Sequence, residues 1–336
     1  MTGLDRDSAA DSRLAALAVE MERATGVSPS VAHVPLHAHT TMRVGGVADL
    51  WATARDVATL SALVGFACDR EIPCLVLGRG SDLVVSDAGV RGLVILNRAE
   101  GALVEDNRLI AESGLPLAGA AMLAQNSGLT GLEFGLAIPG TVGGAVWANA
   151  GAHGSDVAAV LESVTVLRPD GTEIVEPAAD LRFGYRDSRF KHPAGEGSAT
   201  GDVILSATFS LEAGDPDAIK VRLDEIRAWR QAHQPLKQPS AGSVFRNPSG
   251  DSAGRLIDAC GLRGERLGGA AVSDQHANFI VNLGDATASD VRGLADLARK
   301  AVSERFGVQL DYEVQFIGDW SGWGQPAAAP TTPRTA

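Results

Sequence analysis

Residues 137–154 read AIPGTVGGAVWANAGAHG, within a run of 22 residues from Phe134 to Ser155 that contains no Asp, Glu, Lys or Arg. The run is long enough to cross a bilayer as a helix. It also contains Pro139, Asn149 and six glycines, which would interrupt a lone membrane helix and leave backbone groups unpaired in lipid. We therefore expect a backbone that closely approaches a packing partner or a ligand, and no membrane insertion.

The composition is that of a globular chain with 336 residues, enough for two or three domains. Asp and Glu outnumber Lys and Arg by 41 to 29, so the net charge is −12 and a general nucleic-acid binder is disfavoured. A small anionic ligand is still compatible, because it responds to local charge.

Neither the cysteines nor the histidines predict a metal site or a disulfide framework. The three cysteines form no CxxC pair, and Pro35 separates the clustered His33, His37 and His39. The first residues have no apolar core after a basic start, so they do not resemble a secretory signal. We expect a cytoplasmic protein without a metal.

The hydrophobic pattern favours the α+β class. A helical pattern over 56–70 precedes three closely spaced apolar strands at 74–78, 82–86 and 92–97, which does not resemble a regular βαβ series. A hairpin is expected over 163–176, and the proline-rich segment 234–242 predicts a domain boundary. Further helices are expected at 12–25, 116–125, 219–233, 252–260 and 290–306, and further strands at 47–52, 202–211, 278–282 and 308–317.

Two glycine loops are candidates for phosphate binding. In the first, LGRGS (77–81), Gly78 and Gly80 allow a sharp turn that presents several N–H groups, although a plain β-turn has the same pattern. The second, IPGTVGG (138–144), adds the Thr141 hydroxyl, although a glycine-packed turn is the alternative. Neither loop has the GxGxxG of a Rossmann fold or the lysine of a Walker loop.

Seven segments, in order, resemble the UDP-N-acetylenolpyruvoylglucosamine reductase family, flavoproteins of peptidoglycan precursor synthesis. They are TTMRVGG (40–46), LGRGSDLVV (77–85), the glycine-rich 131–154, FGYRDSRFK (183–191), AGSVFRNP (241–248), HANFIVN (276–282) and DYEVQFIG (311–318). The resemblance covers roughly residues 35–318. The segment 187–242 has no tyrosine, so the chain resembles the shorter form of the family, which lacks a tyrosine-bearing loop.

The resemblance implies a two-subdomain FAD-binding fold of the PCMH/vanillyl-alcohol-oxidase type, followed by a C-terminal α+β substrate-binding domain. The expected boundaries are a helical extension at 1–30, FAD-binding subdomains at 31–110 and 111–214, the substrate-binding domain at 215–318 and a disordered tail at 319–336.

The resemblance also implies that the two glycine loops hold FAD. The cofactor-binding residues so implied are Arg43, Gly78, Arg79, Gly80, Ser81, Ile138, Pro139, Gly140, Thr141, Gly143, Gly144, Asn149 and Gly151. Asp82 departs from the family pattern, where Asn is expected. Because an anion beside a pyrophosphate is unfavourable, we interpret Asp82 as a residue that shapes the loop.

Three residues match the family's catalytic positions: Arg186, Ser243 and Glu313. From the residues alone, Arg186 would be a surface arginine paired with Asp187, opposite Phe183 and Tyr185 by strand alternation, Ser243 a turn residue, and Glu313 part of a solvated strand face. The resemblance makes Ser243 the proton donor, and it implies substrate contacts from Tyr185, Arg246, Asn247, His276 and Asn278.

The reaction implied is reduction of an enolpyruvyl ether on a sugar nucleotide, with hydride passing from NADPH to FAD and then to the alkene. Arg186 would neutralise charge on the substrate carboxylate. A bare Glu313 anion would oppose the developing charge, so we expect it to be protonated, with a raised pKa. We expect a monomer.

Two alternatives are another FAD-dependent oxidoreductase of the same superfamily and a non-catalytic nucleotide-binding protein on this fold. The former would share the glycine loops without GSVFRNP and DYEVQFIG, and the latter would not need Arg186, Ser243 and Glu313 together.

Overall fold

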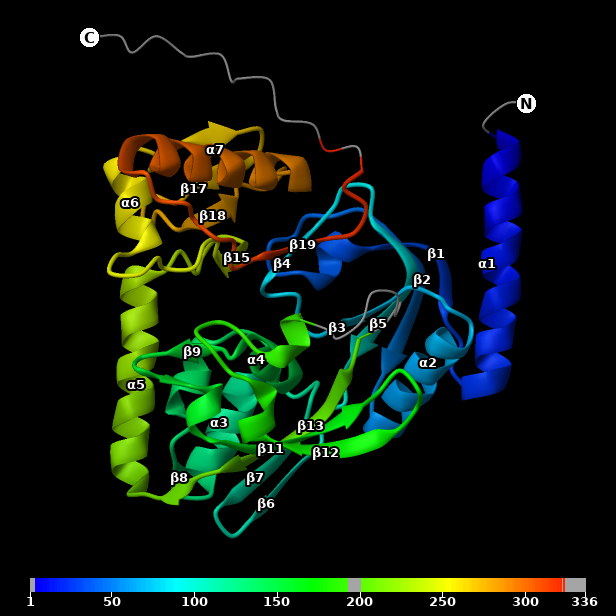
Figure 1. Cartoon of the computed structure of the whole chain (residues 1–336), viewed down its shortest axis with the longest axis horizontal. Helices are drawn as coiled ribbons and strands as arrows, with labels where there is room; N and C mark the ends of the chain where they lie inside the picture. The colour runs from blue at the N-terminus through cyan, green and yellow to red at the C-terminus, as the bar shows by residue number, and fades with distance from the viewer. Residues whose placement is uncertain (1–3, 193–200, 322, 324–336) are drawn as a thin grey trace. The chain divides into compact units, whose positions relative to one another are not determined.

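The computed structural model describes residues 4–192, 201–321 and 323. The chain forms two compact units. The first contains residues 1–34, 47–81 and 90–232, and the second contains residues 35–46, 82–89 and 233–336. Each unit combines helices with small sheets, which confirms the predicted α+β class (Figure 1).

The first sheet of the first unit has the strand order β1-β2-β5-β3. The strands are β1 (Ser30–Pro35), β2 (Val47–Ala54), β3 (Cys74–Leu77) and β5 (Val90–Asn97). β5 pairs in parallel with both β2 and β3. The connection from β2 to β3 contains α2 (Val57–Asp69), which begins at Asp56, whose side chain accepts a hydrogen bond from the Thr59 amide.

The first helix packs on this part of the unit. α1 (Leu4–Thr25) begins earlier than the predicted residue 12, and it contacts α2. Ala18 and Met21 are buried in the core that includes α2 and β5, and Leu14 and Leu17 are partly buried against it. These four residues recur at helical spacing and form the apolar face of the helix.

The second sheet of the first unit has the order β12-β11-β13-β7-β6, and the strand pairs are antiparallel. Its strands are β6 (Ala102–Glu105), β7 (Arg108–Glu112), β11 (Leu161–Leu167), β12 (Glu173–Pro177) and β13 (Val203–Ser210). The predicted hairpin is β11–β12. The sheet shares one apolar core with α3 (Leu117–Asn126) and α4 (Val142–Ala148). The unit also has two short antiparallel strand pairs. One joins β8 (Leu129–Thr130) to β14 (Glu212–Ala213), and the other joins β9 (Gly151–Ala152) to β10 (Ser155–Asp156). The helix α5 (Pro216–His233) follows β14.

The second unit is built on an antiparallel sheet of order β15-β18-β17-β16. The strands are β15 (Ser240–Ser243), β16 (Arg266–Leu267), β17 (Ala270–Val272) and β18 (Phe279–Asn282). α6 (Ala253–Ala259) and α7 (Ala288–Phe306) share its core.

Residues 82–89, although early in the chain, belong to the second unit. β4 (Leu83–Val85), one of the three strands predicted in series, pairs in parallel with β19 (Gln315–Ile317) and not with β3 or β5. Asp87 accepts hydrogen bonds from the amides of Ala288 and Ser289 at 2.8 and 2.9 Å, so it caps the start of α7. The pairing and the cap hold this segment in the second unit.

The final predicted strand, 308–317, is wrong in extent, because only Gln315–Ile317 form a strand. The predicted alternation is still visible, since Leu310 and Val314 are buried while Gln309 and Asp311 are exposed. After the strand, Trp320 and Trp323 lie over the Arg292 guanidinium at 4.5 and 5.1 Å. Residues 322 and 324–336 of the predicted tail lie outside the described residues.

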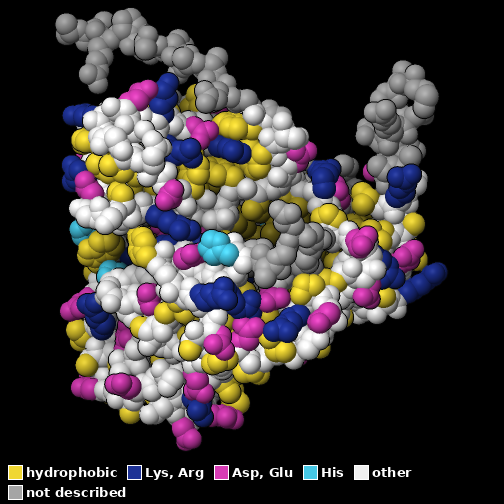
Figure 2. Space-filling view, viewed as in Figure 1, with side chains coloured by type: hydrophobic (Ala, Val, Ile, Leu, Met, Phe, Trp, Pro, Cys, Tyr) yellow, Lys and Arg dark blue, Asp and Glu magenta, His cyan; other side chains and the backbone are white. Residues whose placement is uncertain are grey.

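The described residues contain no helix with the length and apolar character that crossing a membrane needs. The uncharged run 134–155 instead begins within a 3₁₀ helix (Glu133–Ala137) and contains the seven-residue α4 and β9. On the face drawn in Figure 2, acidic and basic side chains are interspersed among the described residues.

A matched pair of glycine substitutions tests the packing of the first sheet. Gly92 in β5 has φ +94°, and a Cβ there would lie 2.2 Å from the Pro73 carbonyl oxygen. Gly92→Ala should lower the free energy of unfolding by about 2–5 kcal/mol through left-handed strain and overpacking. Gly65 in α2 has nothing within 4 Å of such a Cβ, so Gly65→Ala should raise stability by about 0.5–1 kcal/mol. Denaturant unfolding measures both, and a neutral Gly92→Ala would contradict the close contact.

Candidate functional site

The two glycine loops, about 60 residues apart in sequence, lie against each other in the first unit. A Cβ on Gly78 would lie 2.7 Å from Thr141 Oγ1, and one on Gly140 would lie 3.3 Å from Ser81 Oγ. Gly80 is buried with φ +58°. The loops therefore form one glycine-rich surface, and the absence of side chains at these positions is what allows the approach.

The second loop uses part of its backbone for packing and not for a ligand. The amides of Val142 and Gly143 donate to the carbonyls of Leu115 and Ser113, at 2.8 and 2.9 Å. A Cβ on Gly143 would lie 2.8 Å from the Ser113 Cβ. Thr141 is buried, and its hydroxyl accepts from the Gly144 amide at 3.4 Å, which caps α4. Gly143 is thus needed for close packing, and its amide is engaged by the Ser113 carbonyl.

At the other end of α4, Asn149 is engaged by hydrogen bonds within the protein. Its side chain is 3% exposed, and the residue ends the helix in the left-handed conformation, with φ +43°. Its side-chain nitrogen donates to the Gly184 carbonyl at 2.9 Å, and its side-chain oxygen accepts from the Ala158 amide at 3.0 Å. Because these bonds engage the side chain within the protein, we do not retain Asn149 as a cofactor ligand.

Arg186 lies in a tight turn and not in a strand, so the predicted alternation with Phe183 and Tyr185 is wrong. Gly184 and Asp187 exchange two backbone hydrogen bonds, with Tyr185 and Arg186 between them. Arg186 has φ +55°, and its Nη2 donates to the Gly151 carbonyl at 2.5 Å. Tyr185 is 55% exposed, with the Arg186 guanidinium 5.4 Å from its ring centre. Asp187 binds His192 at 3.0 Å.

In the second unit, the segments that carry Ser243 and Glu313 are neighbours. Ser243 is the last residue of β15, where Gly242 has φ +76° and the pairing with β18 shifts register, as at a β-bulge. The next residue, Val244, accepts from the Glu313 amide at 2.8 Å, and Arg246 donates its amide to the Asp311 carbonyl at 2.9 Å. Phe245 stacks on Tyr312 with ring centres 5.2 Å apart. Two of the three predicted catalytic residues are therefore brought together.

Asn278, predicted to contact substrate, is a structural residue of the same group. It is 3% exposed, its side chain accepts from the Phe245 amide at 3.0 Å, and it donates to the Phe245 carbonyl at 2.8 Å. Its own carbonyl accepts from the Val244 amide. Asn278 thus holds the backbone that directly follows Ser243.

Arg246 and Asn247 differ in what engages them. The Nε of Arg246 is buried and has no hydrogen-bond partner within the described part of the chain. An unsatisfied buried donor is costly, so an incoming acceptor would be favoured there. Asn247 is exposed, and its side chain accepts from the Ala253 amide at the start of α6, at 3.0 Å.

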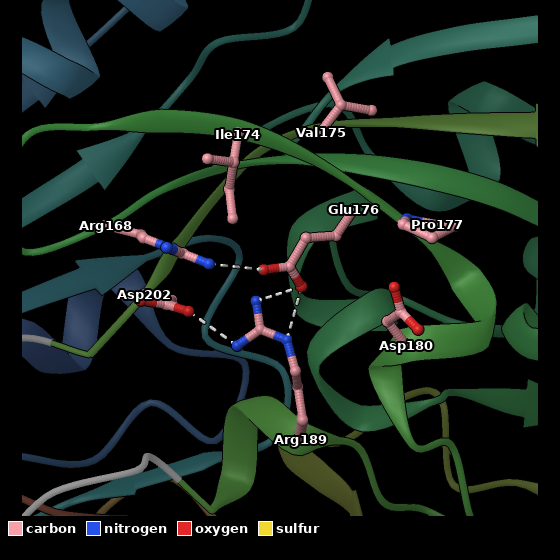
Figure 3. A pocket seen from close by; sticks show the side chains of 8 residues that line it. All are labelled: Arg168, Ile174, Val175, Glu176, Pro177, Asp180, Arg189 and Asp202. Carbon is pink, nitrogen blue, oxygen red and sulfur yellow. Dashed lines mark hydrogen bonds and ion pairs between the residues drawn. The ribbon is translucent and has the colours of Figure 1, made fainter.

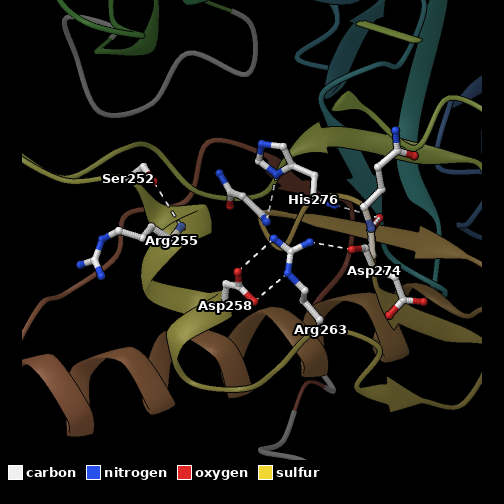
Figure 4. A network of polar contacts seen from close by, with 9 residues as sticks. Ser252, Arg255, Asp258, Arg263, Asp274 and His276 are labelled. Carbon is white, nitrogen blue, oxygen red and sulfur yellow. Dashed lines mark hydrogen bonds and ion pairs between the residues drawn. The ribbon is translucent and has the colours of Figure 1, made fainter. Parts of the chain in front are cut away.

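His276 is held as a neutral imidazole with a defined tautomer. Its Nδ1 accepts from the Asn278 amide at 3.2 Å, which places the ring proton on Nε2 (Figure 4). Burial, the nearby Arg263 and His233 lower the pKa of His276. Arg263 is itself fixed by Asp258 and by the Asp274 carbonyl, both at 2.6 Å. His276 can therefore act as a neutral hydrogen-bond donor.

The structure also places the other residues of the predicted cofactor loops, and Arg43. Arg43 is exposed with φ +57°, and its carbonyl accepts from Asn282 in the second unit. Arg79 and Pro139 are exposed, and Ile138 packs partly against the core. The Asp82 carbonyl accepts from the Gln315 amide at 2.9 Å and extends the β4–β19 pairing.

A hollow of about 590 Å³ at the outer edge of the second sheet is a separate feature (Figure 3). Most of its charged lining is internally paired, because Arg189 binds Glu176 and Asp202, each at 2.7 Å. The residues that line it include none of the predicted site residues. It is therefore better explained by an ion-pair network than by a ligand site.

Sequence reasoning missed Lys191 and Trp147. The Lys191 ammonium donates to the Arg186 carbonyl at 2.8 Å and lies 4.5 Å from the Trp147 ring centre. The Trp147 carbonyl accepts from the Ser188 hydroxyl at 2.6 Å. Trp147 lies in the glycine-rich segment 131–154 and Lys191 in FGYRDSRFK (183–191), but nothing in their spacing indicates that they meet.

Comparisons with known proteins agree with this arrangement. A family model described as an FAD binding domain matches residues 48–175, and one described as the C-terminal domain of UDP-N-acetylenolpyruvoylglucosamine reductase matches residues 234–317. The reductase of that name from Lactiplantibacillus plantarum is 41% identical over 282 residues, 84% of this chain and 91% of its own length. A protein named UDP-N-acetylenolpyruvoylglucosamine reductase 2, from Symbiobacterium thermophilum, is 44% identical over 286 residues, which are 84% of this chain and 91% of its own length.

Among solved structures, the reductase from Thermus caldophilus is similar with a TM-score of 0.71 and 37% identity, over 86% of this chain and 99% of its own. Together with the two matched models, it confirms an FAD-binding fold followed by a C-terminal α+β domain.

The lowered pKa of His276 predicts a pH dependence of stability. The unfolded chain takes up this proton near the ordinary value of 6.5, and the folded chain only at lower pH. Stability should therefore fall as pH drops through about 6.5 towards the folded pKa. His276→Asn should reduce the loss of melting temperature between about pH 7.5 and 5.5, and His37→Gln, at an exposed position, is the control. Burial also lowers the pKa of His153. His153 should therefore preserve part of the dependence of melting temperature on pH. If His276→Asn loses as much melting temperature over this pH range as the wild type, the pH dependence does not come from His276.

Proposed function

Because the chain belongs to the UDP-N-acetylenolpyruvoylglucosamine reductase family, we propose that it reduces the enolpyruvyl group of UDP-N-acetylglucosamine enolpyruvate to give UDP-N-acetylmuramate, using FAD and NADPH. The observation that carries the proposal is the pairing of the Ser243 and Glu313 segments beside the buried Asn278. An oxidoreductase that shared only the glycine loops would not need this arrangement.

The residues of the first unit fit FAD. Gly78 and Gly140 let the two loops touch, because a Cβ at either position would meet Thr141 or Ser81. The backbone of both loops can then face one pyrophosphate. We propose that Gly78, Arg79, Gly80 and Ser81 of the first loop, and Ile138, Pro139, Gly140, Thr141 and Gly144 of the second, hold the cofactor, together with Arg43. Gly143 and Gly151 would contribute by close packing.

Bound FAD, once reduced by NADPH, would supply the hydride that the alkene accepts. Reduction places negative charge beside the substrate carboxylate, and Arg186 is suited to neutralise it because a guanidinium stays protonated and bonds in a fork. The turn that carries Arg186 and the bond to Gly151 hold the guanidinium before substrate arrives. Preorganised charge of this kind needs little rearrangement during the reaction.

Ser243 would give its hydroxyl proton to the carbon next to the carboxylate. A hydroxyl is normally a weak acid, but an enolate-like carbon is a strong enough base at short range. Glu313 would carry a proton, since a bare anion would oppose the developing charge. Backbone hydrogen bonds hold their two segments together.

Substrate contacts are proposed for Tyr185, Arg246, Asn247 and His276. The buried, unpartnered Arg246 Nε and the neutral His276 would both donate to substrate oxygens, such as those of a diphosphate or a sugar. We also propose a cytoplasmic monomer that supports cell-wall synthesis and so cell shape and division. The domain boundaries given above, at 30, 110, 214 and 318, are part of the same proposal.

Separate half-reactions test the role of Ser243. The wild-type protein loaded with FAD should oxidise NADPH faster when the enolpyruvyl sugar nucleotide is present. Ser243→Ala should leave reduction of the bound FAD by NADPH nearly unchanged, but slow its reoxidation by the substrate about 10²–10⁴-fold. Stopped-flow absorbance of the flavin measures both steps. Ser249→Ala, at an exposed position, is the control. Equal slowing of both steps would refute proton donation by Ser243.

Glu313→Gln tests whether a transferable proton is needed at that position. Gln retains a hydrogen-bond donor but cannot pass on a proton, so turnover should fall at least about tenfold while FAD content stays unchanged. Gln309→Glu, at an exposed position of the same segment, controls for a charge change. Full activity of Glu313→Gln would leave Glu313 with a hydrogen-bonding role only.

A further inference from the structure

Asn149, at the end of α4, connects the glycine-rich run to the turn that carries Arg186. We propose that Asn149 is a positioning residue for Arg186 and not a ligand of the cofactor. The inference rests on the proposed function, because it assigns Asn149 to the step in which Arg186 meets the substrate carboxylate.

The hydrogen bonds of the Asn149 side chain all lead to protein groups. Its amide nitrogen donates to the Gly184 carbonyl at 2.9 Å and, more weakly, to Asp156 at 3.4 Å. Its oxygen accepts from the Ala158 amide at 3.0 Å. A primary amide has two N–H donors and one carbonyl oxygen, so each of these groups has a protein partner. At 3% exposure, the side chain is enclosed by these partners.

The bond to Gly184 fixes the base of the turn. Gly184 pairs with Asp187 in both directions, and its carbonyl accepts from the Asp187 amide at 3.1 Å as well as from Asn149. Tyr185 and Arg186 are the two residues between these ends. A shift of the Gly184 carbonyl would therefore move the tip of the turn with it.

The same short segment also holds the Arg186 side chain. The guanidinium donates to the carbonyl of Gly151, two residues after Asn149. Gly151 packs closely on Asp156, since a Cβ there would lie 2.6 Å from the Asp156 Cβ, and Asp156 is also a partner of Asn149. The base of the turn and the guanidinium are thus both attached to residues 149–156.

The turn needs this support because Arg186 is strained. Its φ is +55°, in the left-handed region that non-glycine residues adopt only at a cost in free energy. Two further attachments, from Ser188 to the Trp147 carbonyl and from Lys191 to the Arg186 carbonyl, lie on the C-terminal side. Asn149 supplies the attachment on the N-terminal side, where the turn begins.

Asn149→Gly is the direct test, because glycine adopts the left-handed conformation freely and only the side chain is lost. We expect the dissociation constant of FAD and the rate of FAD reduction by NADPH to change less than about threefold. Reoxidation by the enolpyruvyl substrate should slow about 10- to 100-fold, the effect of a small displacement of a catalytic group. Arg182→Gly is the matched control, because Arg182 is exposed, also left-handed with φ +50°, and lies four residues before Arg186.

A double-mutant cycle with Arg186→Ala separates positioning from a general loss of structure. Asn149→Gly should have little further effect on reoxidation when Arg186 is already absent. Asn149→Asp is the second variant, since it keeps an acceptor for the Ala158 amide and replaces the donor to Gly184 and Asp156 with a carboxylate oxygen. It should slow the same step even if Asn149→Gly folds poorly, and thermal unfolding reports the folding of each variant.

The outcomes distinguish the inference from the proposed function. If Arg186→Ala slows reoxidation but both Asn149 variants leave it unchanged, the positioning role is overturned and the function stands. A large rise in the FAD dissociation constant that persists in the Arg186→Ala background would instead make Asn149 a cofactor residue. If Arg186→Ala affects neither half-reaction, the proposed role of Arg186 fails first.

Discussion

The close approach of Gly78 to Thr141 is the contact on which the proposed cofactor surface depends. A side chain at position 78 would meet the Thr141 hydroxyl at 2.7 Å, so only glycine allows the two loops to touch. Thr141 in turn caps α4, and Asn149 ends it. One seven-residue helix therefore connects the loop contact at its start to the Arg186 turn at its end.

Two buried asparagines have the same physical role in the two units. Asn149 holds the Gly184 carbonyl before Arg186, and Asn278 binds both backbone groups of Phe245 after Ser243. A primary amide suits this position because it can donate and accept at once without charge, and a buried charge would be costly. Each asparagine was predicted to bind a ligand, and in each case the structure shows bonds to the backbone that carries a neighbouring catalytic candidate.

Much of the local structure could be predicted from the sequence. The apolar face of α1, the β11–β12 hairpin and the helices α2, α3, α5, α6 and α7 follow from short-range periodicity and turn residues. The partner of β4 could not be predicted, because its three residues look like any short apolar strand and pair with β19 more than 200 residues later. The predicted strand over 308–317 was too long, because alternation reports burial and not the hydrogen bonds that define a strand.

The sequence by itself determined that this chain has two glycine loops without a lysine. It also determined that Arg186, Ser243 and Glu313 match the catalytic positions of a reductase family. Those are properties of residue identity and order. The tertiary structure alone decided that the loops touch, that Val142 and Gly143 donate to Leu115 and Ser113, and that Asn149 and Asn278 face backbone. These outcomes depend on hydrogen bonds between segments far apart in the chain, and a buried polar group bonds to whichever partner the packing brings within reach.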